Sequence, residues 1–312
     1  MNKPFFSVKR NVIFTAIFYT FLWGSAFPVV KICMESLGIS DSDNMSKCLV
    51  AGIRFVLSGL ITLLWCKVFY KEKSLLNKQQ IKYILLYGIL ATAFQYAFTY
   101  ISLSRIDGSK GAIYDQLCVF VIVLMSGLVF KDDKLSIKKI LGCITGFLGV
   151  VIINTNGLGF DFSLGGEGVM LLAVVCQTVA YFVAKGSSDK IPAPYLVGCG
   201  QLIGGVILCV FSLCLGGKIC IINSTAIITL IILALISAVA YVLSLMPLKY
   251  FPASEISSFN LLITVFGVVM SSLLLKEDIF RWNYAVSLAL IAIGIVFINS
   301  RGKDKWKGIF LM

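Results

Sequence analysis

Apolar runs of about 20 residues follow one another along almost the whole chain. At a helical rise of 1.5 Å per residue, each run can cross the ~30 Å hydrocarbon core of a bilayer. Only 13% of the 312 residues are charged, against roughly 25% in soluble domains, and the mean hydropathy is +0.95. A soluble protein of this size could not bury so many helices that are apolar on every side. The sequence therefore predicts an all-α membrane protein.

Polar or Gly/Pro-containing stretches divide the apolar runs into ten segments. The first follows a basic stretch, as a signal sequence would, but its apolar part exceeds the ~7–15 residues of a signal h-region, so we expect a retained helix. The linkers are short, and none of them leaves room for a soluble domain. The predicted transmembrane helices are residues 11–34, 48–70, 81–104, 109–130, 137–155, 167–187, 193–216, 224–249, 253–275 and 281–300.

Several functional classes lack the residues that they need. The sequence has no histidine and its ten cysteines form no CxxC pair, so we expect no metal site. It has no Walker A motif, so ATP does not drive the protein directly, and we expect no cofactor. Carboxylates are scarce within the spans, which argues against catalytic residues and a membrane enzyme. The net charge of +12 does not indicate nucleic acid, because the basic residues fall in short loops between spans.

The basic residues also predict the orientation of the chain. If the N-terminus is cytoplasmic, nineteen lysines and arginines lie on the cytoplasmic side and seven on the outer side, with Arg54 inside a span. Cytoplasmic loops of membrane proteins carry the excess of Lys and Arg. We therefore expect both termini to be cytoplasmic.

The two halves of the chain share an ungapped repeat. When residues 81–155 are placed on 226–300 with an offset of 145, seventeen of the 75 positions are identical, among them Tyr96/Tyr241, Ser109/Ser254 and Asp133/Asp278. The short charged loops "KDDK" and "KEDIFR" are copies of one another under this offset. We interpret both loops as interfacial hairpins with a structural role. Contact with the substrate is the alternative.

Each half holds five spans, an odd number, so the second half enters the membrane inverted relative to the first. The predicted repeats are residues 11–155 and 167–300. Two inverted halves that rock about a central site are the architecture of secondary transporters. A non-transporting receptor would not require such a repeat.

The order of these features resembles the EamA family of the drug/metabolite transporter superfamily. The resemblance rests on "LWGSAFPVVK" in the first span, the arginine in the second, and the acidic hairpin followed by a Gly-containing final span. It implies a secondary transporter of the bacterial cytoplasmic membrane that exports small organic metabolites, such as amino acids or related amphiphiles. A nucleotide-sugar or lipid-carrier transporter of the same superfamily is the alternative.

Polar side chains within the spans are the candidates for the transport path, because in hydrocarbon they must face protein or a water-filled cavity. Interhelical hydrogen bonds are the alternative role for each of them, and simple packing is the alternative for the tryptophan. The candidate substrate-binding residues are Trp23, Arg54, Gln95, Tyr96, Tyr114, Asp115, Gln177, Tyr181, Tyr241 and Asn260.

Arg54 and Asp115 are the charged residues among these candidates. Each lies about six positions inside its span, which is ~9 Å of depth at the helical rise, and their charges are opposite. We expect them to form one partly buried pair at the outer end of the path. Asp115 is also the candidate for proton coupling, since the repeat places the neutral Asn260 at the matching position.

The expected partners are a small-molecule substrate and the lipid bilayer, with no nucleic acid. Proton coupling and a homodimer stay open as further expectations, and facilitated diffusion is the alternative to proton coupling.

Overall fold

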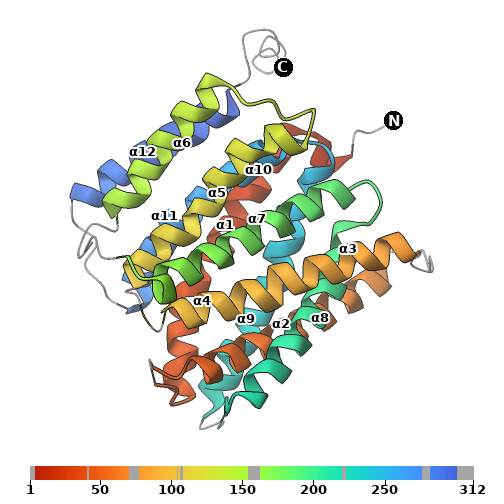
Figure 1. Cartoon of the computed structure of the whole chain (residues 1–312), viewed down its shortest axis with the longest axis vertical. Helices are drawn as coiled ribbons and strands as arrows, with labels where there is room; N and C mark the ends of the chain where they lie inside the picture. Colours follow the sequence, from red (N-terminus) through yellow and green to blue (C-terminus); the bar gives the residue numbers. More distant parts are fainter. Residues whose placement is uncertain are drawn as a thin grey trace.

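The chain folds into a single bundle of helices in the computed structural model (Figure 1), which describes residues 4–40, 42–69, 77–103, 105, 108–153, 162–219, 223–275 and 282–300. The first half contains η1 (Phe5–Ser7), α1 (Lys9–Ser36), α2 (Asn44–Phe69), α3 (Lys78–Gly88), η2 (Ile89–Phe94), α4 (Gln95–Leu103), α5 (Gly108–Val129) and α6 (Ile137–Ile153). The second half contains η3 (Leu164–Gly168), α7 (Val169–Ser187), α8 (Ala193–Cys214), α9 (Ser224–Leu245), η4 (Met246–Lys249), α10 (Ala253–Ser258), η5 (Phe259–Leu261), α11 (Leu262–Leu275) and α12 (Trp282–Asn299).

Each of the ten predicted spans is helical over most of its described residues. Seven helical stretches of the described chain are long and apolar enough to cross a membrane, and shorter apolar helices lie at Tyr114–Val129 and Ala285–Asn299. Two spans are less regular than expected. The third changes from α to π geometry over η2, and the ninth is interrupted by the 3-10 turn η5. Both irregular segments lie beside candidate site residues, which is where such interruptions are common.

The ends of the helices show that the halves are inverted. The Nζ of Lys9, at the start of α1, lies 3.5 Å from the carbonyl oxygen of Asn299 at the end of α12. We call this end of the bundle the terminal face. The Nζ of Lys185, near the end of α7, donates hydrogen bonds to the carbonyl oxygens of Leu248 and Phe251, which lie between α9 and α10. It also donates a hydrogen bond to the carboxylate of Asp132 in the α5–α6 loop, at the same face. Thus α1 begins at the face where α7, the first helix of the second half, ends.

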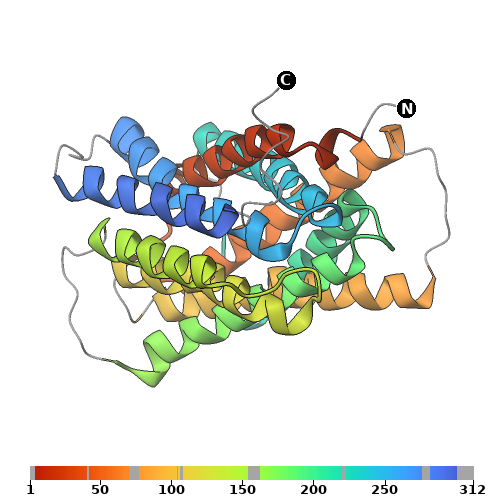
Figure 2. The ribbon, with the colours of Figure 1, turned by 90° about the horizontal axis from the view of Figure 1, so that it is seen from above.

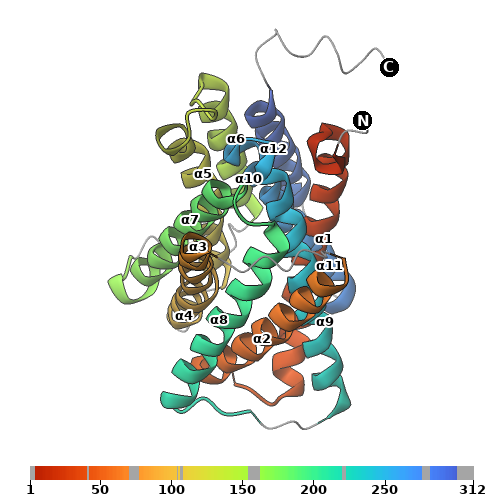
Figure 3. The ribbon, with the colours of Figure 1, turned by 90° about the vertical axis from the view of Figure 1, so that its right-hand side faces the viewer.

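The helix contacts obey the same symmetry. The second helix of one half packs on the second of the other (α2 on α8), and the two fifth helices pair likewise (α6 on α12). These two pairs lie at opposite edges of the bundle (Figures 1 and 3). The first helix α1 packs on α9 and α11 of the other half, as seen from above in Figure 2, and α7 packs on α3, α4 and α5 in return.

Glycines let the paired helices approach closely. A methyl group on Gly59 of α2 would lie 2.7 Å from the backbone nitrogen of Leu202, and one on Gly205 of α8 would lie 2.8 Å from that of Val56. In the other pair, methyl groups on Gly142 and Gly294 would each lie 2.8 Å from the other glycine's carbonyl oxygen. Lipid tails are as apolar as leucine, so helices in a membrane gain little by burying large apolar side chains against one another. Small residues favour association instead, because they let the helix backbones approach closely. The halves are therefore joined at both edges by close backbone contact.

The α2–α8 crossing can be tested with Gly205→Val. The added side chain would overlap backbone atoms that cannot move independently, so we expect the free energy of unfolding to fall by about 1–3 kcal/mol or more. Thermal unfolding of the purified protein in detergent measures the change. Gly186→Ala is the control, because nothing lies within 4 Å of the added methyl group. Equal unfolding temperatures for Gly205→Val and the unmodified protein would contradict the proposed packing.

Candidate functional site

Six aromatic rings from both halves meet at the centre of the bundle. We call them the central aromatic cluster, and they are Tyr19 and Trp23 of α1, Phe55 of α2, Tyr96 and Tyr100 of α4, and Tyr241 of α9. The ring centroids of Trp23 and Tyr241 lie 5.0 Å apart, and those of Phe55 and Tyr96 lie 4.5 Å apart. Offset and edge-to-face pairs at these distances contribute about 0.5–1.5 kcal/mol each beyond their burial.

Two rings of this cluster are repeat mates. The hydroxyl oxygens of Tyr96 and Tyr241 lie 3.0 Å apart in a hydrogen bond, and the residues are separated by 145 positions, the offset of the sequence repeat. Equivalent residues of two halves can touch only close to the axis that relates the halves. The tyrosine pair therefore marks the centre of the inverted repeat.

Arg54 reaches this centre from α2. Its Nε donates a 2.7 Å hydrogen bond to the Oγ of Ser237 on α9, and its guanidinium carbon lies 5.2 Å from the centroid of the Phe55 ring. Its side chain is buried, and no ion pair joins it to Asp115 among the described residues. The expected Arg54–Asp115 pair is therefore wrong. The reason is that α2 packs on α8 and α9, whereas α5, which carries Asp115, packs on α6, α7 and α10.

The repeat mates Asp115 and Asn260 lie in different surroundings. The Oδ1 of Asn260, in the 3-10 turn η5, accepts a 3.1 Å hydrogen bond from the hydroxyl of Tyr19. Asp115 is half-buried on α5. Its neighbour Tyr114 packs with Phe98 against Met170 and Ala173 of α7. The matching positions of the repeat thus hold a carboxyl group in the first half and an amide in the second.

Gln177 and Tyr181 lie one turn apart on α7. The Oε1 of Gln177 and the hydroxyl of Tyr181 are buried and have no hydrogen-bond partner within the protein. Tyr181 packs against the same apolar cluster as Tyr241. A buried polar atom without a partner costs about 1–3 kcal/mol, so these two atoms favour a polar ligand or water between α7 and the tyrosine pair. Gln95, the first residue of α4, is also buried.

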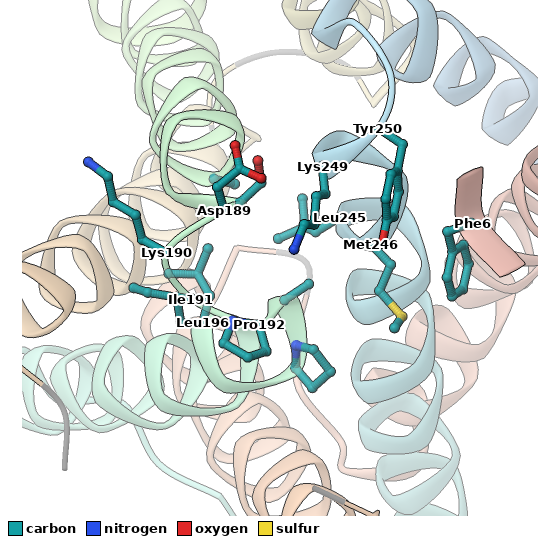
Figure 4. Close-up of a pocket in the computed structure, with 14 residues that line it drawn as sticks. Phe6, Asp189, Lys190, Ile191, Pro192, Leu196, Leu245, Met246, Lys249 and Tyr250 are labelled. Atoms are coloured by element: carbon teal, nitrogen blue, oxygen red, sulfur yellow. The ribbon is translucent and has the colours of Figure 1, made fainter. Parts of the chain in front are cut away.

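A pocket of about 320 Å³ opens at the terminal face (Figure 4). Asp189, Lys190 and Pro192 lie on one side of it, and Lys249 and Tyr250 of the α9–α10 connection lie on the other. Its lining includes Ala184 and Leu245, which follow Tyr181 and Tyr241 by about one helical turn. The buried side chains of Leu196 and Leu245 form its inner wall. The pocket therefore lies about one helical turn from Tyr181 and Tyr241, on the side of the terminal face.

The EamA-like transporter family matches the sequence twice, over residues 10–155 and again over residues 164–300. The chain belongs to the EamA-like transporter family. It is similar to the uncharacterized transporter YvbV of Bacillus subtilis (strain 168), with 23% identity over 303 residues that cover 95% of this chain and 93% of YvbV. It is also similar to the uncharacterized transporter YdfC of the same organism, with 24% identity over 54% of this chain and 51% of YdfC.

A solved crystal structure has the same fold. It aligns with a TM-score of 0.74 and 14% identity, over 91% of this chain and 97% of the other. The resemblance to EamA proteins that the sequence motifs suggested is confirmed. As a member of this family, the protein is a multi-pass membrane transporter and not an enzyme.

The fold brings some of the candidate residues into contact, together with other residues that the sequence analysis did not single out. Ring contacts connect four of the candidates, either directly or through Phe55: Trp23, Arg54, Tyr96 and Tyr241. Asn260 is connected to them through its hydrogen bond with Tyr19, whose ring contacts Trp23. Phe55 and Ser237 were missed because an apolar ring and a lone serine carry no signal within an apolar span. Tyr19 lies one turn before Trp23 on α1, and this spacing could have indicated it.

The tyrosine pair predicts a particular result for a double-mutant cycle. Tyr96→Phe or Tyr241→Phe alone leaves one partly buried hydroxyl without its partner, so each should lower the free energy of unfolding by about 1 kcal/mol. The double variant removes both hydroxyls and should cost less than the sum of the two. Thermal unfolding of the four proteins measures this coupling. Strictly additive losses would show that the hydroxyls do not interact.

Proposed function

We propose that this EamA protein exports small organic metabolites, with an amino acid or related amphiphile as the substrate, by alternating access at the central aromatic cluster. The tyrosine pair carries the proposal, because a site on the axis between inverted halves can face either side of the membrane in turn. The moving units are residues 11–155 and 167–300. The terminal face is the cytoplasmic side of a bacterial cytoplasmic membrane.

The residues around the axis favour a ligand with an apolar body and a polar end. The aromatic rings offer apolar walls, while Arg54, Asp115 and the unpaired atoms of Gln177 and Tyr181 offer a few polar contacts. This is the usual composition of a small-molecule site. All ten candidate residues stay candidates for substrate contact, including Gln95 and Tyr114, which lie on α4 and α5.

A nucleotide-sugar or lipid-carrier substrate is the second candidate within the superfamily. Such ligands carry phosphates, which proteins bind with several cationic donors. Among the lysine and arginine side chains that the structure describes, Arg54 alone is buried. This single buried cation favours a substrate with one acidic group over a diphosphate.

Transport by reconstituted vesicles tests the proposal. We expect vesicles with the protein to move at least one member of a panel of amino acids and amphiphilic metabolites faster than protein-free vesicles. Protonation of Asp115 would couple transport to the proton gradient, so a pH gradient should raise the initial rate of the unmodified protein. No movement of any panel member under any gradient would overturn the proposed function.

Asp115→Asn separates coupling from binding. The variant carries the same amide as Asn260 at the matching position of the second half, so we expect it to fold and insert normally. Without a gradient the variant should still exchange substrate, but a pH gradient should no longer raise its initial rate of transport. An unchanged response of Asp115→Asn to the gradient would exclude Asp115 as the coupling residue.

The orientation can be measured at position 132, whose side chain is 60% exposed at the terminal face. In a thiol-free background, Asp132→Cys should react with a membrane-impermeant maleimide only when the reagent reaches the cytoplasmic side. The expectation follows from the excess of basic residues at this face. Labelling from outside intact cells would reverse the proposed orientation. A homodimer, which the transport mechanism does not require, stays a prediction for mass measurement in detergent.

A further inference from the structure

The short helix α10 is unusual among the spans because it is both polar and completely buried. Its six residues include Ser254, Glu255, Ser257 and Ser258, and all six are buried at the terminal face. Buried polar groups in a membrane protein need partners within the protein. The partners of α10 come from several helices, and the most important one comes from the other half.

Asp133 holds the first turn of α10. It lies in the loop between α5 and α6, and only 1% of it is exposed. Its Oδ2 accepts a 2.8 Å hydrogen bond from the backbone nitrogen of Ser254, and its Oδ1 accepts another from the Oγ of Ser254. The ammonium of Lys139 forms an ion pair with the same carboxylate. A carboxylate at the start of a helix satisfies N–H groups that have no partner in the helix and is favoured by the helix dipole.

Two further ion pairs join the halves at this face. Lys9 of α1 pairs with Glu255 of α10 at 2.7 Å, and Lys185 of α7 pairs with Asp132 beside Asp133 at 3.4 Å. Lys185 also donates 2.9 Å hydrogen bonds to the carbonyl oxygens of Leu248 and Phe251, just before α10. The polar contacts of the terminal face therefore converge on the start of the ninth span.

We propose that the bond between Asp133 and the start of α10 is a latch that keeps the two halves together at the terminal face and is released when the path opens there. The inference rests on the proposed transport function, because only a transporter needs this face to open and close. The substrate enters or leaves through the terminal face while the latch is released.

The hinge that such a latch needs lies directly after α10. The 3-10 turn η5, Phe259–Leu261, separates α10 from α11 and contains Asn260, whose side chain bonds to Tyr19 of the central cluster. A stretch of 3-10 helix within a span is a common site of bending. Movement of α10 about η5 would therefore link the terminal face to the central site.

The carboxylate keeps a partner when the latch is released. Lys139 lies in the same half as Asp133 and also donates a 2.9 Å hydrogen bond to the carbonyl oxygen of Lys134, so it moves with the loop. Burial raises the pKa of Asp133, but the hydrogen bonds from Lys139 and Ser254 outweigh it and hold the pKa below its usual range. Asp133 is therefore charged at neutral pH, and movement of the helices rather than protonation releases it.

Hydrogen–deuterium exchange of the full-length protein in lipid nanodiscs tests the latch without measuring transport. Asp133→Ala should raise the exchange rate of the α10 amides about tenfold. Asp133→Asn keeps one acceptor oxygen and should give a smaller increase. It replaces the alanine variant in this measurement if that variant does not fold. Asp43→Ala is the matched control, since Asp43 caps the start of α2 through the backbone nitrogen of Ser46 at 3.0 Å, within one half. Unchanged exchange of α10 in Asp133→Ala and Asp133→Asn would overturn the latch.

A covalent bond in place of the latch gives the second test. Oxidation of the double variant Asp133→Cys with Ser254→Cys should abolish transport in vesicles, and a reductant should restore it. The single variants, treated alike, control for the native cysteines. Normal transport by the cross-linked protein would show that this contact need not open. If the unmodified protein moves no solute, the proposed function fails, and the exchange measurement still decides whether Asp133 holds α10.

Discussion

The absence of water from the bilayer core is the constraint on which the rest of this structure depends. Polar side chains that face lipid would lose their hydrogen bonds, so the chain must place them between helices. Several of them lie where the two halves meet. Arg54 reaches Ser237, Tyr96 reaches Tyr241, and Asp133 reaches Ser254 across this boundary. Polar contacts therefore join the two halves across their boundary.

The repeat is symmetric in its backbone and asymmetric in its chemistry. The glycine contacts of α6 with α12 are reciprocal, since each methyl group would meet the other glycine's carbonyl. The polar residues break this symmetry, because the matching positions hold a carboxyl group, Asp115, in the first half and an amide, Asn260, in the second. The two halves therefore share a backbone arrangement while differing in the polar groups that they carry.

The sequence predicted the spans well because span length and hydropathy are local properties. The offset of 145 also predicted that Tyr96 and Tyr241 are equivalent, and the structure shows them in contact. The Arg54–Asp115 pair failed because sequence gives the depth of a residue in its span but not the direction in which it faces around the helix. Whether two such residues meet depends on which helices are neighbours, and α2 packs on α8 and α9 whereas α5 packs on α6, α7 and α10.

Apolar and polar contacts between the halves can then serve different purposes. The close glycine crossings lose their packing whenever they separate, and lipid offers nothing equivalent in return, so they suit contacts that persist. When a hydrogen bond at the terminal face breaks, its donor and acceptor bind water in place of each other. The net contribution of such a bond to stability is only about 0.5–1.5 kcal/mol, or somewhat more for a charged partner. Ser254 and Asp133 can therefore separate into water at modest cost. The polar loop between α5 and α6 suits a contact that forms and breaks, as the proposed latch requires, whereas the close crossing of α2 and α8 suits a contact that persists.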